Sequence, residues 1–236
     1  MSTINPNELH PIQGQILKGL LFHPERKFSE LNSESVPSDQ FSFHLRRLSE
    51  LNLIRKTESG YELTITGKEF ANRFDTDSPK MKLERQAKLG VLITCIKEES
   101  GKMLFLIQQR LKHPFYGYHG FLTGKIKWGE SIFETAKREL LEETGLKADL
   151  KLVGVEHKMD YSPAGELLED KYFFVFRGDN PRGELMENME GGRNFWATKE
   201  EFMKLPDLYA DVESAMEKTL SPDIKVWEKK FTVERY

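Results

Sequence analysis

The chain has 236 residues, of which 38% are hydrophobic and 31% charged, with a formal net charge of −3 at pH 7. This length suits one large domain or two small ones, and the composition is typical of a folded globular protein. Because the net charge is slightly negative, a globally basic nucleic-acid- or membrane-binding protein is excluded. Any such contact would need a local basic patch.

The cysteine content and the terminal segment bear on the compartment. Cys95 is the only cysteine, so an internal disulfide is excluded and a reducing environment is the simplest expectation. Residues 1–15 lack the apolar core of a signal peptide. No apolar run approaches the roughly 18–20 residues that a membrane helix needs. We therefore expect a cytoplasmic protein without membrane contact.

Residues 1–78 show the pattern of a small helical domain with a hairpin. Apolar residues at helical spacing predict helices over 12–21 and 28–31 and a third that begins at Pro37-Ser38. Two strands follow over 53–56 and 61–65, joined across Glu58-Ser59-Gly60, and a further helix is expected over 66–74. The polar stretch 75–80 contains a proline and marks the end of this domain. We place the first domain at 1–78, a linker at 79–87 and the second domain at 88–236.

The second domain alternates strands with one strong helix. Apolar runs predict strands over 89–96 and 103–107 with a turn at Ser100-Gly101, and further strands over 152–155, 172–176 and 195–197. A short helix is expected near 199–204. Strands around a strong helix predict an α/β or α+β layered domain.

The strong helix has clear start and stop signals. Ser131 and Glu134 form a capping-box pattern at its beginning, and Gly145 is suited to end it in a left-handed conformation. Phe133, Ala136 and Leu140 share a face that can pack on the sheet.

Three glutamates, Glu139, Glu142 and Glu143, share another face of this helix. Clustered carboxylates repel one another, and a divalent cation removes that conflict. Oxygen ligands favour Mg²⁺, with Mn²⁺ as a substitute, and such an ion can neutralise phosphate charge and activate water. The alternative is a solvated acidic helix with Arg138 offering salt bridges.

The segment 124–146 resembles the sequence box of the Nudix hydrolase family. That box has glycine, five residues, glutamate, seven residues, Arg-Glu, an aliphatic residue, any residue, Glu-Glu, any residue, glycine and an aliphatic residue. Every constrained position is filled here, by Gly124, Glu130, Arg138, Glu139, Leu140, Glu142, Glu143, Gly145 and Leu146. The resemblance covers about 88–216. It implies an α/β/α sandwich fold and a Mg²⁺-dependent hydrolase that cleaves the diphosphate linkage of a nucleoside diphosphate derivative with an activated water.

The resemblance also implies roles for the box residues. Glu142 and Glu143 would be metal ligands, and Glu139 a third ligand or the base that orients water. Arg138 would pair with Glu130 and hold the loop on the helix. Gly124 would let the backbone approach metal or phosphate, with catalysis depending on Glu139, Glu142 and Arg138.

Outside the box, the metal ligands are less determined. Many relatives have glycine before the first box glycine, whereas this chain has Thr123, which puts a backbone-carbonyl ligand at that position in doubt. Relatives also recruit a carboxylate from a later loop. Glu190, before Gly191-Gly192, is the candidate, and an ordinary loop charge is the alternative.

Three residues around the box are candidates for substrate binding. Arg110 could meet a phosphate, Tyr118 could stack on a base, and Trp128 could cover the substrate or anchor its own loop. The stretch 161–165 faintly resembles the Ser-Pro-Gly segment of ADP-ribose pyrophosphatases, although a hairpin turn is the favoured explanation of it. ADP-ribose or a nucleotide sugar is therefore the favoured substrate.

The order of elements in 1–78 resembles a winged helix-turn-helix domain, which would make DNA a partner. Ser38, Gln40, Arg46 and Arg47 would then face DNA. Residues 1–80 carry ten basic and eleven acidic residues, a poor electrostatic match to phosphates. The alternatives are a homodimerisation module or a cover for the substrate. The competing function for the whole chain is a transcription regulator whose second domain senses a nucleotide metabolite.

Overall fold

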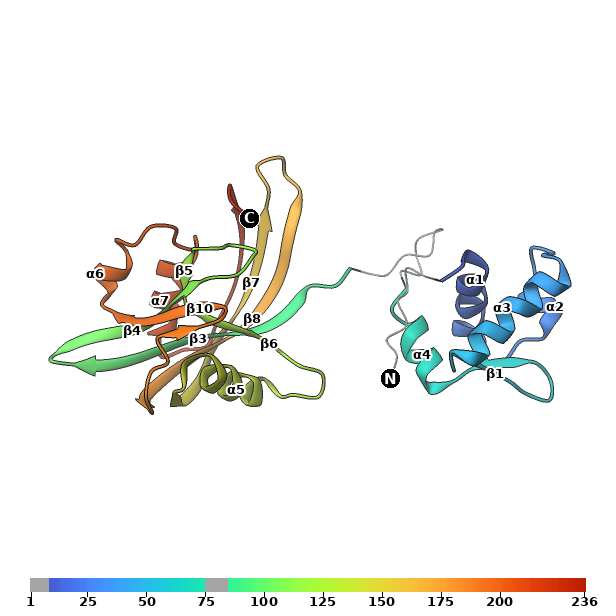
Figure 1. Ribbon diagram of the computed structural model, residues 1–236, viewed down its shortest axis with the longest axis horizontal. Coiled ribbons are helices and arrows are strands. Elements are labelled where there is room, and N and C mark those ends of the chain that lie inside the picture. The colour runs from blue at the N-terminus through green and yellow to red at the C-terminus, as the bar shows by residue number, and fades with distance from the viewer. Residues whose placement is uncertain (1–8, 75–84) are drawn as a thin grey trace. The chain divides into compact units, whose positions relative to one another are not determined.

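The computed structural model describes residues 9–74 and 85–236, and the chain divides into two compact units between Arg85 and Gln86 (Figure 1). The stretch 75–80, which marked the domain boundary in the sequence, lies outside the described residues, as do residues 79–84 of the expected linker. Each unit has its own hydrophobic core and is treated separately.

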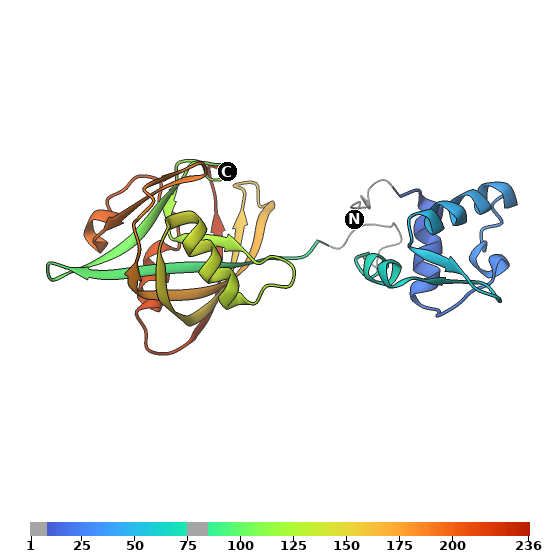
Figure 2. The ribbon, with the colours of Figure 1, turned by 60° about the horizontal axis from the view of Figure 1, so that its bottom comes forward.

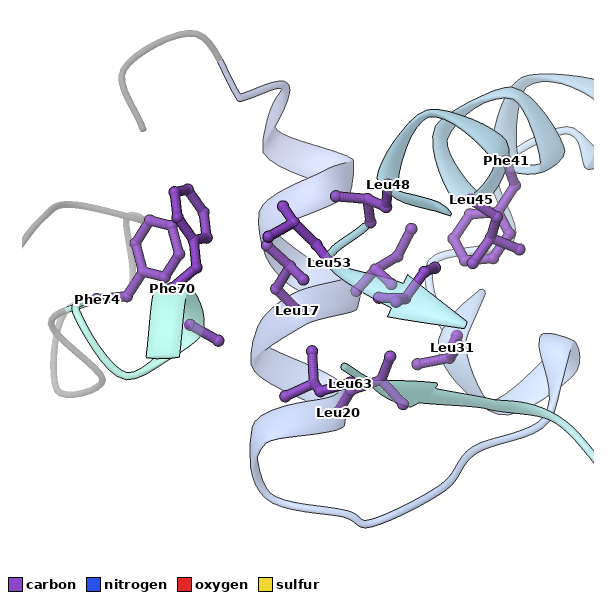
Figure 3. Packing of buried hydrophobic residues seen from close by; sticks show 13 residues of the cluster. Leu17, Leu20, Leu31, Phe41, Leu45, Leu48, Leu53, Leu63, Phe70 and Phe74 are labelled. Atoms are coloured by element: carbon purple, nitrogen blue, oxygen red, sulfur yellow. The ribbon is translucent and has the colours of Figure 1, made fainter. Parts of the chain in front are cut away.

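The first unit has the element order that the sequence predicts. Its helices are α1 (Pro11–Leu21), α2 (Phe28–Leu31), α3 (Ser38–Glu50) and α4 (Ile65–Ala71), and its antiparallel strands are β1 (Ile54–Lys56) and β2 (Tyr61–Leu63). Figure 3 shows the core in which side chains of α1, α3 and the two strands meet, among them Leu17, Leu20, Phe41, Leu45, Leu48, Leu53 and Leu63.

A glycine brings α4 against the hairpin. The Cβ of any other residue at Gly67 would lie 1.8 Å from the carbonyl oxygen of Leu53, so only glycine allows this approach. Thr64 caps the helix by accepting a hydrogen bond from the amide of Gly67.

The second unit is built on a mixed sheet. In chain order its elements are β3 (Lys88–Glu99), β4 (Lys102–Arg110), β5 (His119–Gly120), β6 (Leu122–Lys125), α5 (Ile132–Thr144), β7 (Lys147–Tyr161), β8 (Leu167–Arg182), β9 (Asn188–Met189), β10 (Gly192–Ala197), α6 (Lys199–Phe202), α7 (Val212–Thr219) and β11 (Lys225–Thr232). The strand order is β11-β7-β8-β3-β4-β10-β9, with β5 on β4 and β6 on β3. The β3–β8 and β11–β7 pairs are parallel and the others antiparallel.

Helices cover both faces of this sheet (Figures 1 and 2). Alternate residues of β3 face opposite sides: Val91 and Ile93 pack with α5, and Leu92 packs with α7. The expected α/β/α arrangement is confirmed. Among the described residues, no helix is long and apolar enough to cross a membrane.

Two strands are much longer than their apolar runs indicate. The predicted strands 152–155 and 172–176 are the centres of β7 and β8, which run on through charged residues. The elements α7, β11 and the short β5, β6 and β9 were not predicted. The stretch 161–165 is the turn of the β7–β8 hairpin, with Gly165 at φ 83°, so the turn interpretation is confirmed.

Candidate active site

The site is organised by helix α5, whose ends are those predicted. Ser131 accepts a hydrogen bond from the amide of Glu134, and the Glu134 carboxylate accepts one from the amide of Ser131. This capping box satisfies amides of the first turn that have no partner in the helix. Gly145 ends the helix at φ 74°. The inward face is formed by Ala136 and Leu140, which are fully buried.

Gly124, at the end of β6, makes room for Glu139. A Cβ built on Gly124 would lie 2.0 Å from Cγ and 2.1 Å from Cδ of Glu139. The Glu139 side chain thus occupies the space that any larger residue at 124 would fill. This contact supplies a physical reason for glycine at the first position of the box.

Arg138 connects the loop to the helix through several hydrogen bonds. Its Nε and Nη2 donate to the two carboxylate oxygens of Glu130, at 2.6 and 2.9 Å. Nη1 donates to Glu139 at 2.8 Å and to Glu142 at 3.1 Å, and Nη2 also donates to the carbonyl of Lys125 at 3.1 Å. The predicted pairing of Arg138 with Glu130 is confirmed. Arg138 lowers the pKa of Glu130 to about 2.

The three glutamates differ in environment. Glu139 is 8% exposed, and burial raises its pKa; Arg138 acts in the opposite direction, and Glu143 and Glu142 add to the rise. The Glu143 carboxylate accepts a hydrogen bond from Gln108 at 3.0 Å, and the Glu142 side chain is exposed. In the part of the chain that the structure describes, no group of three or more His, Cys, Asp or Glu side chains is arranged to hold a metal ion.

The donor set nevertheless fits a hard divalent cation. All its side-chain ligand atoms are carboxylate oxygens, which Mg²⁺ prefers. The raised pKa of Glu139 arises partly from its acidic neighbours, a conflict that a bound cation would remove.

The glutamates open onto a cavity of about 730 Å³, within the range of small-molecule sites. Its lining includes Gly124, Arg138, Glu139, Glu142 and Glu143 from the box. The rest comes from strands β3 to β8, from the loops after β4, β5 and β6, and from the start of α7 with the residues just before it. The box therefore lies on the wall of a hollow large enough for a nucleotide-sized ligand.

The candidates outside the box have different surroundings. Arg110 lines the cavity, but its guanidinium donates to the carbonyls of Pro114 at 2.6 Å and His113 at 3.3 Å, so it holds the loop after β4. Tyr118 is not among the lining residues and packs against Phe115 and Tyr209.

Trp128 and Glu190 also lie outside the lining. Trp128 is 95% exposed, so its side chain does not anchor the loop, and that alternative is wrong. Glu190 is exposed in the turn between β9 and β10. Its role as a ligand remains a prediction.

The cavity also contains several charged residues that the sequence did not indicate as site residues. Lys158 on β7 pairs with Asp211 at the start of α7, at 2.8 Å, and both are buried. Lys88 pairs with Glu169 at 2.7 Å, and Lys171 with Asp160 at 2.8 Å. The only sequence signal is a charge at every second position, Glu156, Lys158 and Asp160, which usually marks a solvent-facing side of a strand.

In the first unit, the four candidate DNA-facing residues lie on α3. Ser38, Gln40, Arg46 and Arg47 are all exposed. Arg47 is paired with Glu50 at 3.3 Å, whereas Arg46 has no ion-pair partner within the described ranges. Of the two arginines, Arg46 is therefore the one that α3 presents to solvent without an ion-pair partner among the described residues.

Comparisons with known proteins agree with this geometry. A family model described as NUDIX domain matches residues 87–220. An ADP-ribose pyrophosphatase of Methanocaldococcus jannaschii is 29% identical over 126 residues, which cover 53% of this chain and 71% of the relative. An oxidized purine nucleoside triphosphate hydrolase of Danio rerio is 40% identical over 74 residues, which cover 31% of this chain and 44% of the relative.

Solved structures show the same fold. The MutT protein of Bacillus halodurans has a TM-score of 0.52 at 24% identity, covering 61% of this chain and 90% of that one. The NUDIX domain of NrtR from Shewanella oneidensis, solved with ADP ribose, has a TM-score of 0.50 at 18% identity, covering 66% of this chain and 96% of that one.

Proposed function

Because this chain belongs to the Nudix family of hydrolases, in which a divalent metal is generally required, we propose that it cleaves the diphosphate linkage of a nucleoside diphosphate derivative with Mg²⁺. ADP-ribose is the first substrate to test, since one relative is an ADP-ribose pyrophosphatase and one structural neighbour was solved with ADP ribose. The observation that carries the proposal is the opening of the box glutamates onto the cavity.

In this proposal, Glu139, Glu142 and Glu143 hold Mg²⁺ near Gly124. Bound there, the metal would neutralise phosphate charge and make a water molecule more acidic. Glu139 is the residue best suited to accept a proton, because its burial raises the pKa of the carboxyl group. Arg138 orients Glu139 and Glu142 and is itself held by Glu130.

The test is incubation with Mg²⁺ and a panel of ADP-ribose, nucleotide sugars, dinucleotides and oxidised nucleoside triphosphates. We expect a nucleoside monophosphate among the products. Glu142→Gln should lower kcat by about 100-fold or more, the scale of losing one electrostatic catalytic contact. Glu166→Gln, in the exposed hairpin turn, is the matched control and should leave kcat unchanged. Absence of turnover on the whole panel would reject the proposal.

We also propose a second function for the first unit, the binding of DNA as a winged-helix domain. The exposed Arg46 and Arg47 on α3 favour it, and the excess of one acidic residue in residues 1–80 disfavours tight binding. In this case the second unit would act as the sensor of a nucleotide metabolite in a transcription regulator. A salt-dependent gel shift that Arg46→Ala weakens would support this function, and absence of a shift at low salt would reject it.

The alternative role of the first unit is homodimerisation. The mass in solution of the full chain and of a chain without residues 1–78 distinguishes it. A shortened chain that remains dimeric would exclude this role.

A further inference from the structure

An amide side chain from outside the box holds the carboxylate of Glu143. Nε2 of Gln108 on β4 donates to Oε2 of Glu143 at 3.0 Å. The other oxygen, Oε1, lies 3.9 Å from Nζ of Lys112, so it is the oxygen that faces a cation. One oxygen of this carboxylate is thus fixed by a neutral donor, and the other is left for a positive charge.

The orientation of the Gln108 amide is determined by Asn194, which lies directly opposite it on β10. Nδ2 of Asn194 donates to the backbone carbonyls of Glu143 and Met186, at 2.7 and 2.8 Å. Because Nδ2 faces these two acceptors, Oδ1 faces the other way and accepts from Nε2 of Gln108 at 3.2 Å. The two hydrogens of Nε2 match its two oxygen acceptors, so the Gln108 amide presents a donor to Glu143.

Asn194 also fixes the main chain that carries Glu143. The last carbonyls of a helix have no partner within it. At the end of α5 the carbonyl of Glu143 accepts from Asn194, and that of Thr144 accepts from the amide of Met186 at 2.8 Å. Asn194 is 1% exposed, so its hydrogen bonds are shielded from water. One buried amide therefore holds Glu143 at its backbone directly and at its carboxylate through Gln108.

The glycine pair Gly191-Gly192 leaves space for this arrangement. A Cβ on Gly192 would lie 3.0 Å from Cγ and Cδ of Gln108, closer than ordinary van der Waals contact. A Cβ on Gly191 would lie 3.2 Å from Cδ of Lys112. Both side chains extend toward Glu143. The two glycines thus make room for the groups that surround this carboxylate.

A carboxylate that its neighbours hold in place binds a metal more tightly than a mobile one. Loss of a hydrogen-bond partner of a metal ligand typically weakens metal binding about 10–100-fold. Arg138 holds Glu139 and Glu142, but its positive charge competes with a cation. Gln108 and Asn194 hold Glu143 without a charge, so they fix the ligand and do not oppose the cation.

We propose that Gln108 and Asn194 are positioning residues, which raise the affinity of the box for its divalent cation by fixing the Glu143 carboxylate before the cation binds. The proposal rests on the proposed function, because it takes the box glutamates as the metal ligands. Neither residue belongs to the box, and one lies on each side of it along the chain.

The test measures the binding of Mn²⁺ alone by calorimetry, without substrate. Gln108→Met keeps the length of the side chain and removes its donor, so the Mn²⁺ dissociation constant should rise by about 10-fold or more. The Mg²⁺ concentration that gives half of the maximal rate should rise in parallel. At saturating Mg²⁺, kcat should fall by less than about 3-fold, because the Glu143 carboxylate is still present.

Two controls assign the effect to Glu143. Gln109→Met is the matched control, because Gln109 follows on the same strand and points to the opposite face of the sheet, and it should leave Mn²⁺ binding unchanged. In a Glu143→Gln background, Gln108→Met should cause no further loss of Mn²⁺ affinity, because the carboxylate that it positions is gone.

Two further variants act on the neighbours of Gln108. Asn194→Leu should weaken Mn²⁺ binding as Gln108→Met does. Gly192→Ala should weaken it as well, because the new methyl group displaces the Gln108 side chain, and the backbone of Gly192 is not in the left-handed region that only glycine favours. Gly192→Ala leaves the buried hydrogen bonds of Asn194 in place, so it remains informative if Asn194→Leu fails to fold.

Wild-type Mn²⁺ affinity in Gln108→Met and Gly192→Ala would overturn the proposal, and turnover by the wild type would still support the proposed function. A loss of kcat at saturating Mg²⁺ with unchanged Mn²⁺ binding would assign Gln108 to the substrate and overturn its positioning role. Calorimetry needs no turnover, so a wild-type protein that binds Mn²⁺ and cleaves nothing on the panel would reject the proposed function while the positioning residues are tested independently.

Discussion

Arg138 determines the geometry of the box more directly than any other side chain. Its guanidinium bonds Glu130, Glu139 and Glu142 at once. A metal that binds Glu139 and Glu142 must compete with these bonds. The pairing with Glu130 uses two parallel hydrogen bonds, which lysine cannot reproduce.

The space at Gly124 leads to a prediction. In Gly124→Ala the new methyl group would overlap Glu139, so the carboxylate must move. We expect kcat to fall about 100-fold or more and the free energy of unfolding to fall by about 1–3 kcal/mol. Steady-state kinetics and urea unfolding measure the two effects. Gly19→Ala in α1, where the nearest atom is 3.5 Å away, is the control, and full activity of Gly124→Ala would contradict the prediction.

Glu156 leads to a prediction about pH. Its carboxylate is fully buried without a hydrogen-bond partner, and burial, with the charge of Asp211, raises its pKa from 4.5 to about 7. Below pH 4.5 the Glu156 side chain is protonated in both the folded and the unfolded chain. As the pH rises to 7, the unfolded chain loses its proton more readily, so the stability of the fold decreases.

Glu156→Gln should remove this dependence. At pH 8 the variant should be more stable than the wild type by about 2–3 kcal/mol, and near pH 4.5 the two should be equal. Urea unfolding at pH 4.5, 6 and 8 measures the difference. If the stability of both proteins depended on pH in the same way, Glu156 could not be a buried carboxyl group with a raised pKa.

At the scale of elements, helix α5 was predictable because its signals are local. Ser131, Glu134 and Gly145 act within one turn of the helix ends. The long β7 and β8 were not, since Lys158 and Asp160 remain in buried strands only through partners on other elements. β11 pairs with a strand about seventy positions earlier, and its lysines hide the strand pattern.

The candidate site, too, was predictable only where its signals are local in the sequence. The box gives the glutamates and the pair of Arg138 with Glu130. The sequence could not show that Glu139 is buried and Glu142 exposed, because their exposure depends on strand β6 and Gly124. Asp211 had no local signal, because its partner is 53 residues away.

The cap of α5 gives a prediction at this scale. Ser131→Ala should lower the free energy of unfolding by about 1 kcal/mol, the usual cost of losing a side-chain cap. Ser131→Asp should retain stability, because aspartate also caps helices. Urea unfolding measures both variants. Equal stability of the alanine and serine proteins would show that the cap contributes nothing.

At the scale of the whole molecule, the two units differ in what they contribute to the site. Every described residue that lines the cavity lies between Lys88 and Ala215, and the core of the first unit is separate from those of the second. We expect a chain of residues 86–236 to fold and to hydrolyse the same substrate with kcat and KM within about 3-fold of the full chain, since the second unit has its own core and supplies the described lining of the cavity. Kinetics of the two chains test this, and loss of activity would assign the first unit a part in the site.

The exposed Trp128 makes the loop of the box observable without a label. The protein has three tryptophans, and Trp227 is 9% exposed where Trp128 is 95% exposed. A quencher that stays in water, such as iodide, would therefore reach Trp128 far more readily than Trp227. The change in quenching on adding substrate would report, in real time, whether this loop folds over its ligand.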